Sequence, residues 1–227
     1  ASAQATAALA RTELTRIRGG RKPASDKGNF RINGRHEGET IFILGCGPSI
    51  SNVDFSLLEG RPTIGVNGIL HAFDPAYLLW LDNAAVAEMG ELIERSRAVK
   101  FCAHRVRTVI PARRFRRYTP DRNGPLLSQG FERGLYWSRT SVFPAINLAV
   151  LFGAKRLALM GVDLNDSSHF YGRSGAGNPF PGRDRILADF NRLAKYASEK
   201  GIEITNASME SAVTIFEKKP LEKIIEM

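Results

Sequence analysis

The sequence is poor in cysteine and in long apolar runs. Its 227 residues contain only two cysteines, Cys46 and Cys102, and each lies in or beside an apolar stretch. Two thiols cannot build the disulfide framework of a small secreted domain, so we expect both to be buried and free in a reducing compartment. No apolar run approaches the roughly 20 residues of a membrane-spanning helix. The N-terminus lacks the charged-then-apolar order of a secretion signal, which predicts a cytoplasmic protein, with any membrane contact peripheral.

Clustered metal ligands are also lacking. The four histidines are scattered at positions 36, 71, 104 and 169, and the cysteines lie far apart, so neither residue type has the spacing of a zinc site. The stretch "DLND" (163–166) offers two carboxylates but is not the D-x-D pair that holds Mg²⁺ on a nucleotide. We therefore predict no bound metal.

Acidic residues are outnumbered, with 23 Asp and Glu against 32 Lys and Arg, which gives a formal net charge of +9. This excess predicts an anionic partner, whether nucleotide phosphates, nucleic acid, an acidic glycan or a membrane surface. A solvated basic face is the alternative explanation. Arginines concentrate in residues 104–122, and the candidates for binding an anion are Arg113, Arg114, Arg116, Arg117, Arg139 and Arg173.

Apolar strand-like runs alternate with helical stretches from residue 39 onward. This alternation predicts an α/β fold, a Rossmann-like and mainly parallel sheet with helices on both faces. Residues 1–38 form a separate region, a short basic helical arm (1–18) followed by a Gly-rich linker, and 39–227 form a nucleotide-binding domain. The expected strands are 40–45, 62–67, 76–82, 98–103, 156–163 and 202–207, and the expected helices are 82–97, 141–153 and 183–201.

The first strand ends in "LGCGPS", which contains Gly45, Cys46, Gly47, Pro48 and Ser49. Ligands of open parallel sheets bind at the carboxyl ends of strands. The glycines allow a sharp turn and the approach of a ligand to bare backbone, and Pro48 begins a helix whose free N–H groups would face an anion. The alternative is a tight turn without a ligand.

Asn67 and Asp82 follow the second and third strands. The Asn67 amide would read a donor and an acceptor on a base or ribose, or the residue simply adopts a left-handed turn conformation. The Asp82 carboxylate would hold a ribose hydroxyl, or it caps the following helix.

The strand at 156–163 ends in Gly161 and Asp163, and a polar loop with His169 and Tyr171 follows before a Gly-rich stretch. Such loops gate active sites or lie at the surface without a role. An imidazole suits proton transfer near neutral pH, which makes His169 a candidate general base, with an incidental loop histidine as the alternative.

Six motifs stand out together, spanning about residues 40–216: "ILGCGPSISNVDFSLL", "IGVNGIL", "YLLWLDN", "TSVFPAINLAVLFGAKRLALMGVDLN", "HFYG" and "ITNASMESAVTIF". They resemble the family of the domain of unknown function 115. That family is akin to the bacterial sialyltransferases of glycosyltransferase family 42 and to the archaeal hydroxymethylpterin diphosphokinases. The resemblance implies a transferase with the Rossmann-like fold.

The sialyltransferase pattern implies that the cytidine monophosphate part of a donor is bound by Gly45, Gly47, Pro48, Ser49, Asn67, Asp82, Ser141 and Asp163, with Cys46 and Gly161 beside them. This chain has Cys46 where those enzymes have asparagine, which leaves the identity of the donor open. The same resemblance implies His169 as the base and Tyr171 as the residue that assists the leaving group. The long lid that precedes this pair in the sialyltransferases is missing here.

The leading hypothesis is therefore a metal-independent glycosyltransferase with no tightly bound cofactor, a CMP-sugar or similar co-substrate, and an anionic acceptor such as a glycan or nucleic acid. Backbone N–H groups near Ser49, with Tyr171 and Arg139 or Arg173, would stabilise the departing phosphate. One alternative is an ATP-dependent pyrophosphokinase, with Mg²⁺ held by Asp82, Asp163 or Asp166. Another is a nucleic-acid-binding or base-modifying transferase that uses the basic segment.

Overall fold

A computed structural model of the chain describes residues 30–119, 124–172, 178 and 180–227. The predicted basic helix (1–18), most of the linker and Arg173 lie outside the described residues. The boundary predicted at residue 39 stays a prediction. No helix among the described residues is long and apolar enough to cross a membrane.

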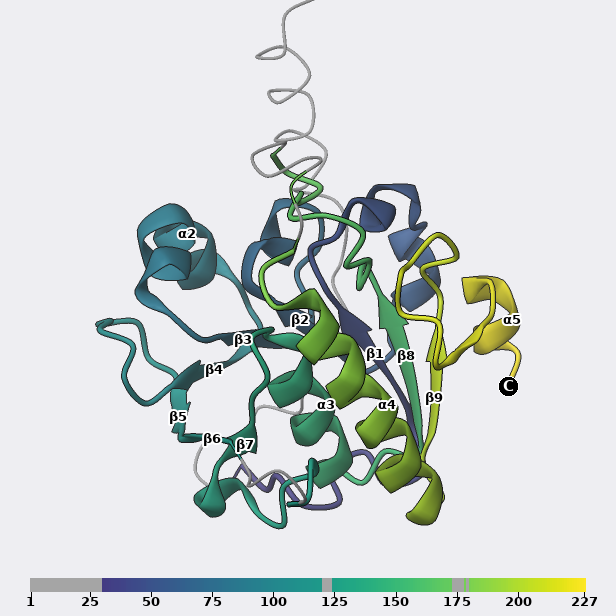
Figure 1. Cartoon of the computed structure of the whole chain (residues 1–227). Helices are drawn as coiled ribbons and strands as arrows, with labels where there is room; N and C mark the ends of the chain where they lie inside the picture. Colours follow the sequence, from purple (N-terminus) through teal and green to yellow (C-terminus); the bar gives the residue numbers. More distant parts are fainter. Residues whose placement is uncertain (1–29, 120–123, 173–177, 179) are drawn as a thin grey trace, which may run out of the picture.

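An eight-stranded sheet forms the centre of the molecule, and all its neighbouring strands are parallel. Its strand order is β10-β9-β8-β1-β2-β3-β4-β5 (Figure 1). The inner strands are almost entirely buried, as expected for a parallel sheet covered on both faces. The strands are β1 (Thr40–Leu44), β2 (Thr63–Val66), β3 (Tyr77–Trp80), β4 (Val99–Ala103), β5 (Arg113–Phe115), β8 (Arg156–Met160), β9 (Glu203–Asn206) and β10 (Glu217–Lys218).

The helices confirm the predicted α/β class. The three helices expected from the sequence are present, each ending within two residues of its expected bounds. A small second sheet pairs β6 (Arg117–Tyr118) with β7 (Leu135–Tyr136). The helices are α2 (Asn83–Arg95), α3 (Val142–Leu151), α4 (Arg183–Glu199) and α5 (Leu221–Ile225), and the 3₁₀ helices are η1 (Pro48–Asn52), η2 (Phe55–Leu58), η3 (Asn67–His71) and η4 (Phe131–Arg133).

Burial explains why α3 and α4 differ in composition. Helix α3 is apolar on all sides. Only its last two residues, Val150 and Leu151, are half-buried, and the others are buried. Helix α4 is amphipathic and buries the stripe Ile186, Phe190, Leu193 and Ala197 at helical spacing. Both helices cover the face of the sheet that is turned to the viewer in Figure 1.

The order of the strands reverses at β1. The chain proceeds from β1 through β2 and β3 to β4 on one side, and from β8 to β9 on the other. Because parallel crossovers are right-handed, the connections of the two halves lie on opposite faces of the sheet. Their carboxyl ends therefore diverge between β1 and β8, which is where ligands of open α/β sheets bind.

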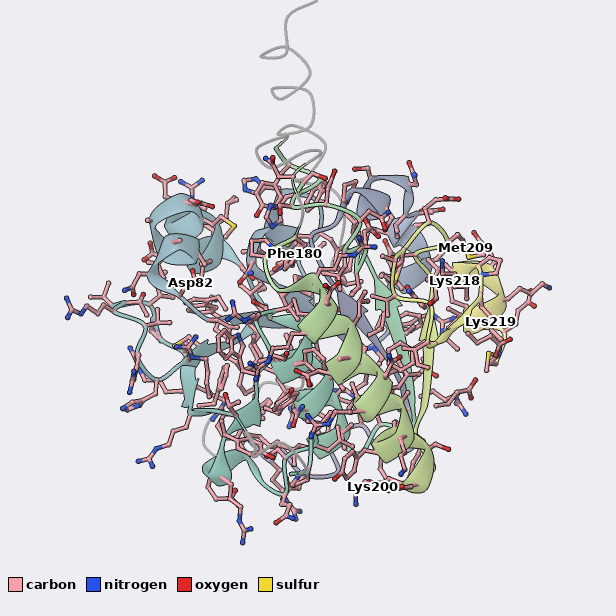
Figure 2. The ribbon with its side chains drawn as sticks, viewed as in Figure 1. Asp82, Phe180, Lys200, Met209, Lys218 and Lys219 are labelled. Carbon is pink, nitrogen blue, oxygen red and sulfur yellow. The ribbon has the colours of Figure 1, made fainter. Side chains whose placement is uncertain are left out.

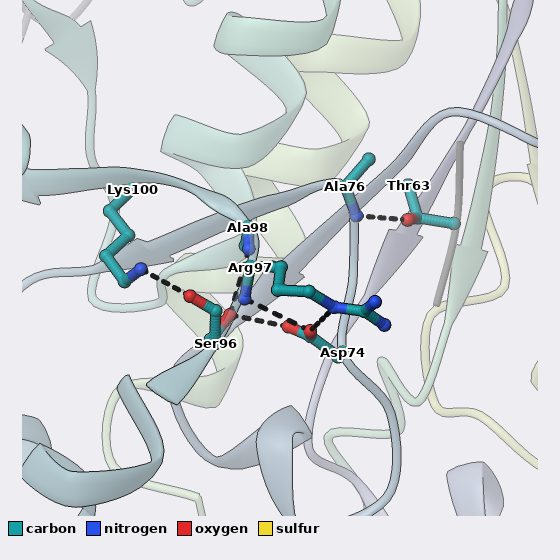
Figure 3. Close-up of polar contacts among 7 residues, drawn as sticks. All are labelled: Thr63, Asp74, Ala76, Ser96, Arg97, Ala98 and Lys100. Carbon is teal, nitrogen blue, oxygen red and sulfur yellow. Dashed lines mark hydrogen bonds and ion pairs between the residues drawn. The ribbon is translucent and has the colours of Figure 1, made fainter. Parts of the chain in front are cut away.

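A polar cluster joins the segments that precede β3 and β4, at the amino ends of these strands (Figure 3). The Ser96 hydroxyl donates to Asp74 Oδ1 at 2.5 Å, and the Arg97 N–H donates to Asp74 Oδ2 at 3.2 Å. Lys100 Nζ donates to the Ser96 carbonyl at 2.6 Å. These contacts join the turn after α2 to the loop before β3, so the two strands leave this edge in fixed register.

Candidate active site

A pocket of about 230 Å³ lies at the carboxyl ends of β1, β2, β3 and β8. Asp82 and Phe180, which line it, lie in the upper part of the view, whereas Lys200 lies at the opposite end of the molecule (Figure 2). Ligand pockets commonly hold about 300–1,000 Å³, so a ligand of ordinary size would extend partly outside this one. Of the residues predicted from the sequence, the lining includes Gly45, Cys46, Gly47, Asn67, Asp82, Arg117, Arg139, Ser141, Gly161, Asp163 and His169.

The other predicted site residues lie elsewhere. Pro48 and Ser49 form the start of η1 behind the pocket wall. Tyr171 is not part of the lining, and neither are Arg113, Arg114 and Arg116. Those three arginines are exposed on or beside the edge strand β5.

The two glycines of the "LGCGPS" turn allow the ends of β1 and β8 to pack closely. A Cβ atom on Gly45 would lie 2.3 Å from the Gly161 carbonyl oxygen, and one on Gly47 would lie 2.4 Å from Asp163 Oδ2. The Gly47 N–H donates to the Gly161 carbonyl at 2.8 Å. The space into which a Cβ of either glycine would project is therefore filled by the protein itself.

Asp163 occupies the position that the sequence assigned to a ligand anion. The Ser49 N–H donates to Asp163 Oδ2 at 2.8 Å, and the Ser49 hydroxyl donates to Asp163 Oδ1 at 2.5 Å. The same hydroxyl lies 3.0 Å from the Ser208 hydroxyl. Since the Ser49 donors already serve a carboxylate, a phosphate at this point would face a negative charge. Ser49 thus acts on the pocket by holding Asp163.

Cys46 is a buried thiol that joins two walls of the pocket. Its Sγ donates to the Val66 carbonyl at 3.1 Å, and its own carbonyl accepts the Phe170 N–H at 3.0 Å. Burial raises the pKa of the Cys46 thiol to about 12, so the group stays protonated near neutral pH. Burial also raises the pKa of Cys102, and both cysteines are free, as the sequence predicted.

Asn67 forms the left-handed turn considered from the sequence, and its role in binding a ligand stays a prediction. Its φ of 45° is left-handed, so the residue forms the turn that starts η3. Its Nδ2 lies 3.1 Å from the Ser141 hydroxyl, while its Oδ1 is buried without a hydrogen-bond partner. In either orientation of the amide, one end faces Ser141 and the other has no protein partner. A ligand donor would satisfy the free oxygen, and a ligand acceptor would satisfy the free NH₂ of the flipped amide.

Backbone strain is concentrated in this pocket. Among the described residues, the non-glycine residues with positive φ are Asn67, Arg139 and Leu164, at 45°, 49° and 53°, and all three line the pocket. Left-handed backbone costs on the order of 1–2 kcal/mol per L-residue. Such costs persist where surrounding structure enforces them, typically at ligand-binding and catalytic sites.

Two arginines and the start of α3 place positive charge in the wall of the pocket. The Arg117 guanidinium lies 4.9 Å from the centre of the Trp137 ring, and both residues line the pocket. The Arg139 side chain packs on Gly182, where an added Cβ would lie 2.7 Å from Arg139 Cδ. Ser141 caps α3 without a side-chain cap bond, so the positive end of the helix dipole adds to the two arginines.

Three carboxylates line the same pocket, and each already accepts a hydrogen bond from the protein. Asp82 Oδ1 accepts the Ala85 N–H at 3.1 Å and so caps α2. Asp166 Oδ1 accepts the Ser168 N–H at 2.8 Å, and Asp163 binds Ser49 as described. Within the described ranges, no group of three or more His, Cys, Asp or Glu side chains is arranged to hold a metal ion.

His169 reaches the pocket from a tight turn supported by aromatic stacking. The His169 N–H donates to the Gly172 carbonyl at 3.3 Å, which closes the turn. The Tyr171 ring lies between those of His169 and His71, at centroid distances of 5.3 Å and 4.8 Å. Gly68 makes room for it, since a Cβ there would lie 2.2 Å from the Tyr171 ring. Burial raises the pKa of Tyr171.

Sequence reasoning missed several lining residues: Val66, Leu81, Trp137, Thr140, Val142, Val162, Leu164, Asp166 as a wall residue, Ser168 and Phe180. Most are apolar neighbours of strand ends and carry no chemical signal. Trp137 follows β7 of the small second sheet and Phe180 precedes α4, so only the fold brings them to the pocket.

Comparisons with known proteins support the fold. No model of a protein family matches the chain, and no curated protein sequence matches it. The MAf glycosyltransferase from Magnetospirillum magneticum AMB-1 superposes with a TM-score of 0.55 at 19% identity, over 96% of this chain and 38% of that one. This chain thus spans less than two fifths of that protein.

The sialyltransferase CstII from Campylobacter jejuni, solved with the substrate analogue CMP-3FNeuAc, gives a TM-score of 0.49 at 13% identity, over 80% of this chain and 86% of that one. A second structure of the enzyme, with a trisaccharide acceptor and CMP, gives 0.48 at 14% identity, over 79% and 85%. At these identities the likeness concerns the fold. Membership of the family of the domain of unknown function 115 stays a prediction.

Proposed function

We propose that this protein is a glycosyltransferase that takes a nucleotide-sugar donor. The observation that carries the proposal is the pocket at the switch point between β1 and β8, where a buried amide oxygen without a partner, two arginines and a histidine meet. Arginines suit phosphates, carboxylates suit the hydroxyls of ribose and sugar, and an amide oxygen suits a base or ribose donor. The MAf glycosyltransferase, whose fold this chain shares, belongs by its name to the same class of enzyme.

The phosphate-binding position in this proposal differs from the one expected from the sequence. We place the departing phosphate near Arg139, Arg117 and the start of α3, because the donors of Ser49 are already bonded to Asp163. Positive charge fixed beforehand stabilises charge that develops in the transition state. The roles of Gly45, Gly47, Pro48 and Ser49 are then to shape the wall and to orient Asp163.

The proposed reaction uses His169 as general base. The imidazole removes the proton from an acceptor hydroxyl as that oxygen attacks the anomeric carbon, and the bond from this carbon to the phosphate oxygen breaks. The electron pair leaves with the nucleotide. Tyr171 stacks on His169, so we propose that it orients the imidazole. General-base catalysis of this kind contributes typically 10²–10⁴-fold in rate.

A thermal-shift panel identifies the donor. CMP, UDP, GDP, ATP and their sugar conjugates are added to the protein with and without Mg²⁺, because a ligand that binds only the folded state raises the melting temperature. We expect a nucleotide-sugar to give the largest shift without Mg²⁺. A shift that only ATP with Mg²⁺ produces would instead favour the pyrophosphokinase alternative.

The rate at which the protein turns over the nucleotide-sugar found by this panel then tests His169 as the general base. We expect His169→Ala to lower the rate at least about 100-fold, while His104→Ala, an exposed histidine outside the pocket, keeps the parent rate. Equal rates for the parent and the His169 variant would remove the proposed base.

A further inference from the structure

The edge of the sheet next to the pocket is strongly basic. From Lys100 to Thr119 the sequence has no acidic residue, and it carries one lysine and six arginines. We call the exposed arginines of this stretch the basic edge: Arg105, Arg107, Arg113, Arg114, Arg116 and Arg117. Among the described residues, none of them forms an ion pair with a carboxylate.

An apolar tip projects from the middle of the basic edge. Residues 104–112 form a loop between β4 and β5 that extends away from the sheet (Figure 1). At its tip, Val109 is 99% exposed, more than any other large apolar side chain that the structure describes. Ile110 beside it is half-buried and Pro111 is exposed.

The loop is held in shape from within. The Arg114 guanidinium donates to the Val106 carbonyl at 2.7 Å and to the carbonyls of His104 and Thr108 at 3.3 Å. The Arg107 N–H donates to Asn83 Oδ1 at 2.8 Å, which fixes the loop to the start of α2. The tip is therefore presented in a defined position. Asn83, to which the loop is bonded, directly follows Asp82 in the wall of the pocket.

We propose that the basic edge and the Val109 tip dock the protein on a membrane surface rich in anionic phospholipid. Negative lipid headgroups match arginines that have no carboxylate partner among the described residues, and the headgroup boundary accepts an aliphatic side chain. Charged side chains also protect edge strands from pairing, which accounts for Arg113 and Arg114 in β5. Protection of β5 does not explain Arg105 and Arg107, which precede that strand. It also does not explain the aliphatic side chain of Val109 at the tip.

A nucleic-acid partner fits the surface less well. Binding of single strands uses exposed aromatic side chains on which bases stack. Beside the basic edge, Phe115 is buried, and Trp137 is half-buried with the Arg117 guanidinium over its ring. The most exposed large apolar side chain that the structure describes, Val109, is aliphatic, and it offers no favourable contact to a phosphate. The membrane proposal shares only Arg117 with the pocket, and its test uses Arg105, Arg107, Arg116 and Val109, none of which lines the pocket.

Vesicle co-sedimentation of the full chain tests the docking surface. The probes are vesicles of phosphatidylcholine alone and of phosphatidylcholine mixed with phosphatidylglycerol. We expect binding only to the mixed vesicles, weakening as salt is raised. Each arginine near such a surface strengthens binding by roughly fivefold, so Arg105→Gln, Arg107→Gln and Arg116→Gln together weaken it on the order of 100-fold. Val109→Asn, which leaves the charge unchanged, weakens it about tenfold.

A matched control separates the surface from net charge. Lys155→Gln, Lys195→Gln and Lys200→Gln remove three exposed charges outside the basic edge, with Lys200 at the other end of the molecule from the pocket (Figure 2). We expect these variants to bind vesicles as the parent does. Equal losses in the arginine and lysine variants, unchanged binding by Val109→Asn, or no vesicle binding would each overturn the proposal. Binding of an oligonucleotide in place of vesicles, lost in the arginine variant, would assign the surface to nucleic acid.

Discussion

Ser49 and Asp163 join the ends of β1 and β8 through two hydrogen bonds. The backbone N–H and the hydroxyl of Ser49 both donate to the Asp163 carboxylate, at 2.8 Å and 2.5 Å. Asp163 is only 6% exposed, so these bonds lie where water competes little. The pair therefore holds the most divergent point of the sheet together and fixes the carboxylate that the pocket presents.

The first prediction concerns the energy of this pair. We expect Ser49→Ala to lower the free energy of unfolding by about 1–2 kcal/mol, because it removes a hydroxyl bonded to a buried carboxylate. A double-mutant cycle with Asp163→Asn, measured by denaturant unfolding, should give a coupling of about 0.5–3 kcal/mol. Additive losses would show that the two residues act separately.

The second prediction concerns the glycine turn. A methyl group on Gly45 meets a backbone oxygen, which cannot move aside as a flexible side chain would. We expect Gly45→Ala to destabilise the fold by about 3 kcal/mol or more. The matched control is Gly90→Ala within α2, where nothing lies within 4 Å of an added Cβ. That substitution should stabilise the protein by about 0.5–1 kcal/mol. Similar melting temperatures for the two variants would contradict this reading of the turn.

The sequence predicted the sheet well where burial dominates. The six expected strands are rich in apolar residues, and all six are present, because strands covered on both faces must be largely apolar. The edge strands were missed. β5 begins with Arg113 and Arg114, and β10 has two charged residues, so neither carries the apolar signal on which strand prediction depends.

The chemistry at the strand ends was harder to predict than the strands. Residue type and position identified Asn67, Asp82 and Asp163 as members of one pocket, because parallel strands end at the same edge. Their partners were not accessible to the same reasoning. Ser49 and Asp163 are 114 residues apart, so their bond depends on tertiary packing. Tyr171 lies only two residues from His169, but its stacking on that ring depends on a turn geometry that no spacing rule fixes.

The third prediction concerns alkaline pH. Burial raises the pKa of Cys46 from near 9 to about 12 in the folded protein, so the unfolded chain loses this proton first. The stabilisation is complete below pH 9 and declines as pH rises toward 12. By linkage the loss at pH 10 is on the order of 1 kcal/mol. Cys46→Ser keeps a donor for the Val66 carbonyl but does not titrate in this range. The difference in unfolding free energy between parent and variant should therefore shrink or reverse from pH 8 to pH 10, and a constant difference would refute it.

The last prediction separates the two roles of Asn67. Glycine adopts positive φ freely, so Asn67→Gly keeps the turn and removes only the amide. We expect its melting temperature to stay close to the parent value, because relief of backbone strain offsets the lost bond to Ser141. Its affinity for the stabilising nucleotide should fall about five- to tenfold, since the unsatisfied amide loses a ligand bond of about 1 kcal/mol.

Asn67→Ala is the matched variant for this test, because it loses the amide and also forces a Cβ-bearing residue without a polar group into the left-handed turn. Isothermal titration and melting curves of both variants then divide stability from recognition. If affinity falls only in the alanine variant, Asn67 serves the turn alone. If it falls equally in both while only alanine lowers the melting temperature, the amide binds the ligand, and the strain at residue 67 is maintained for recognition.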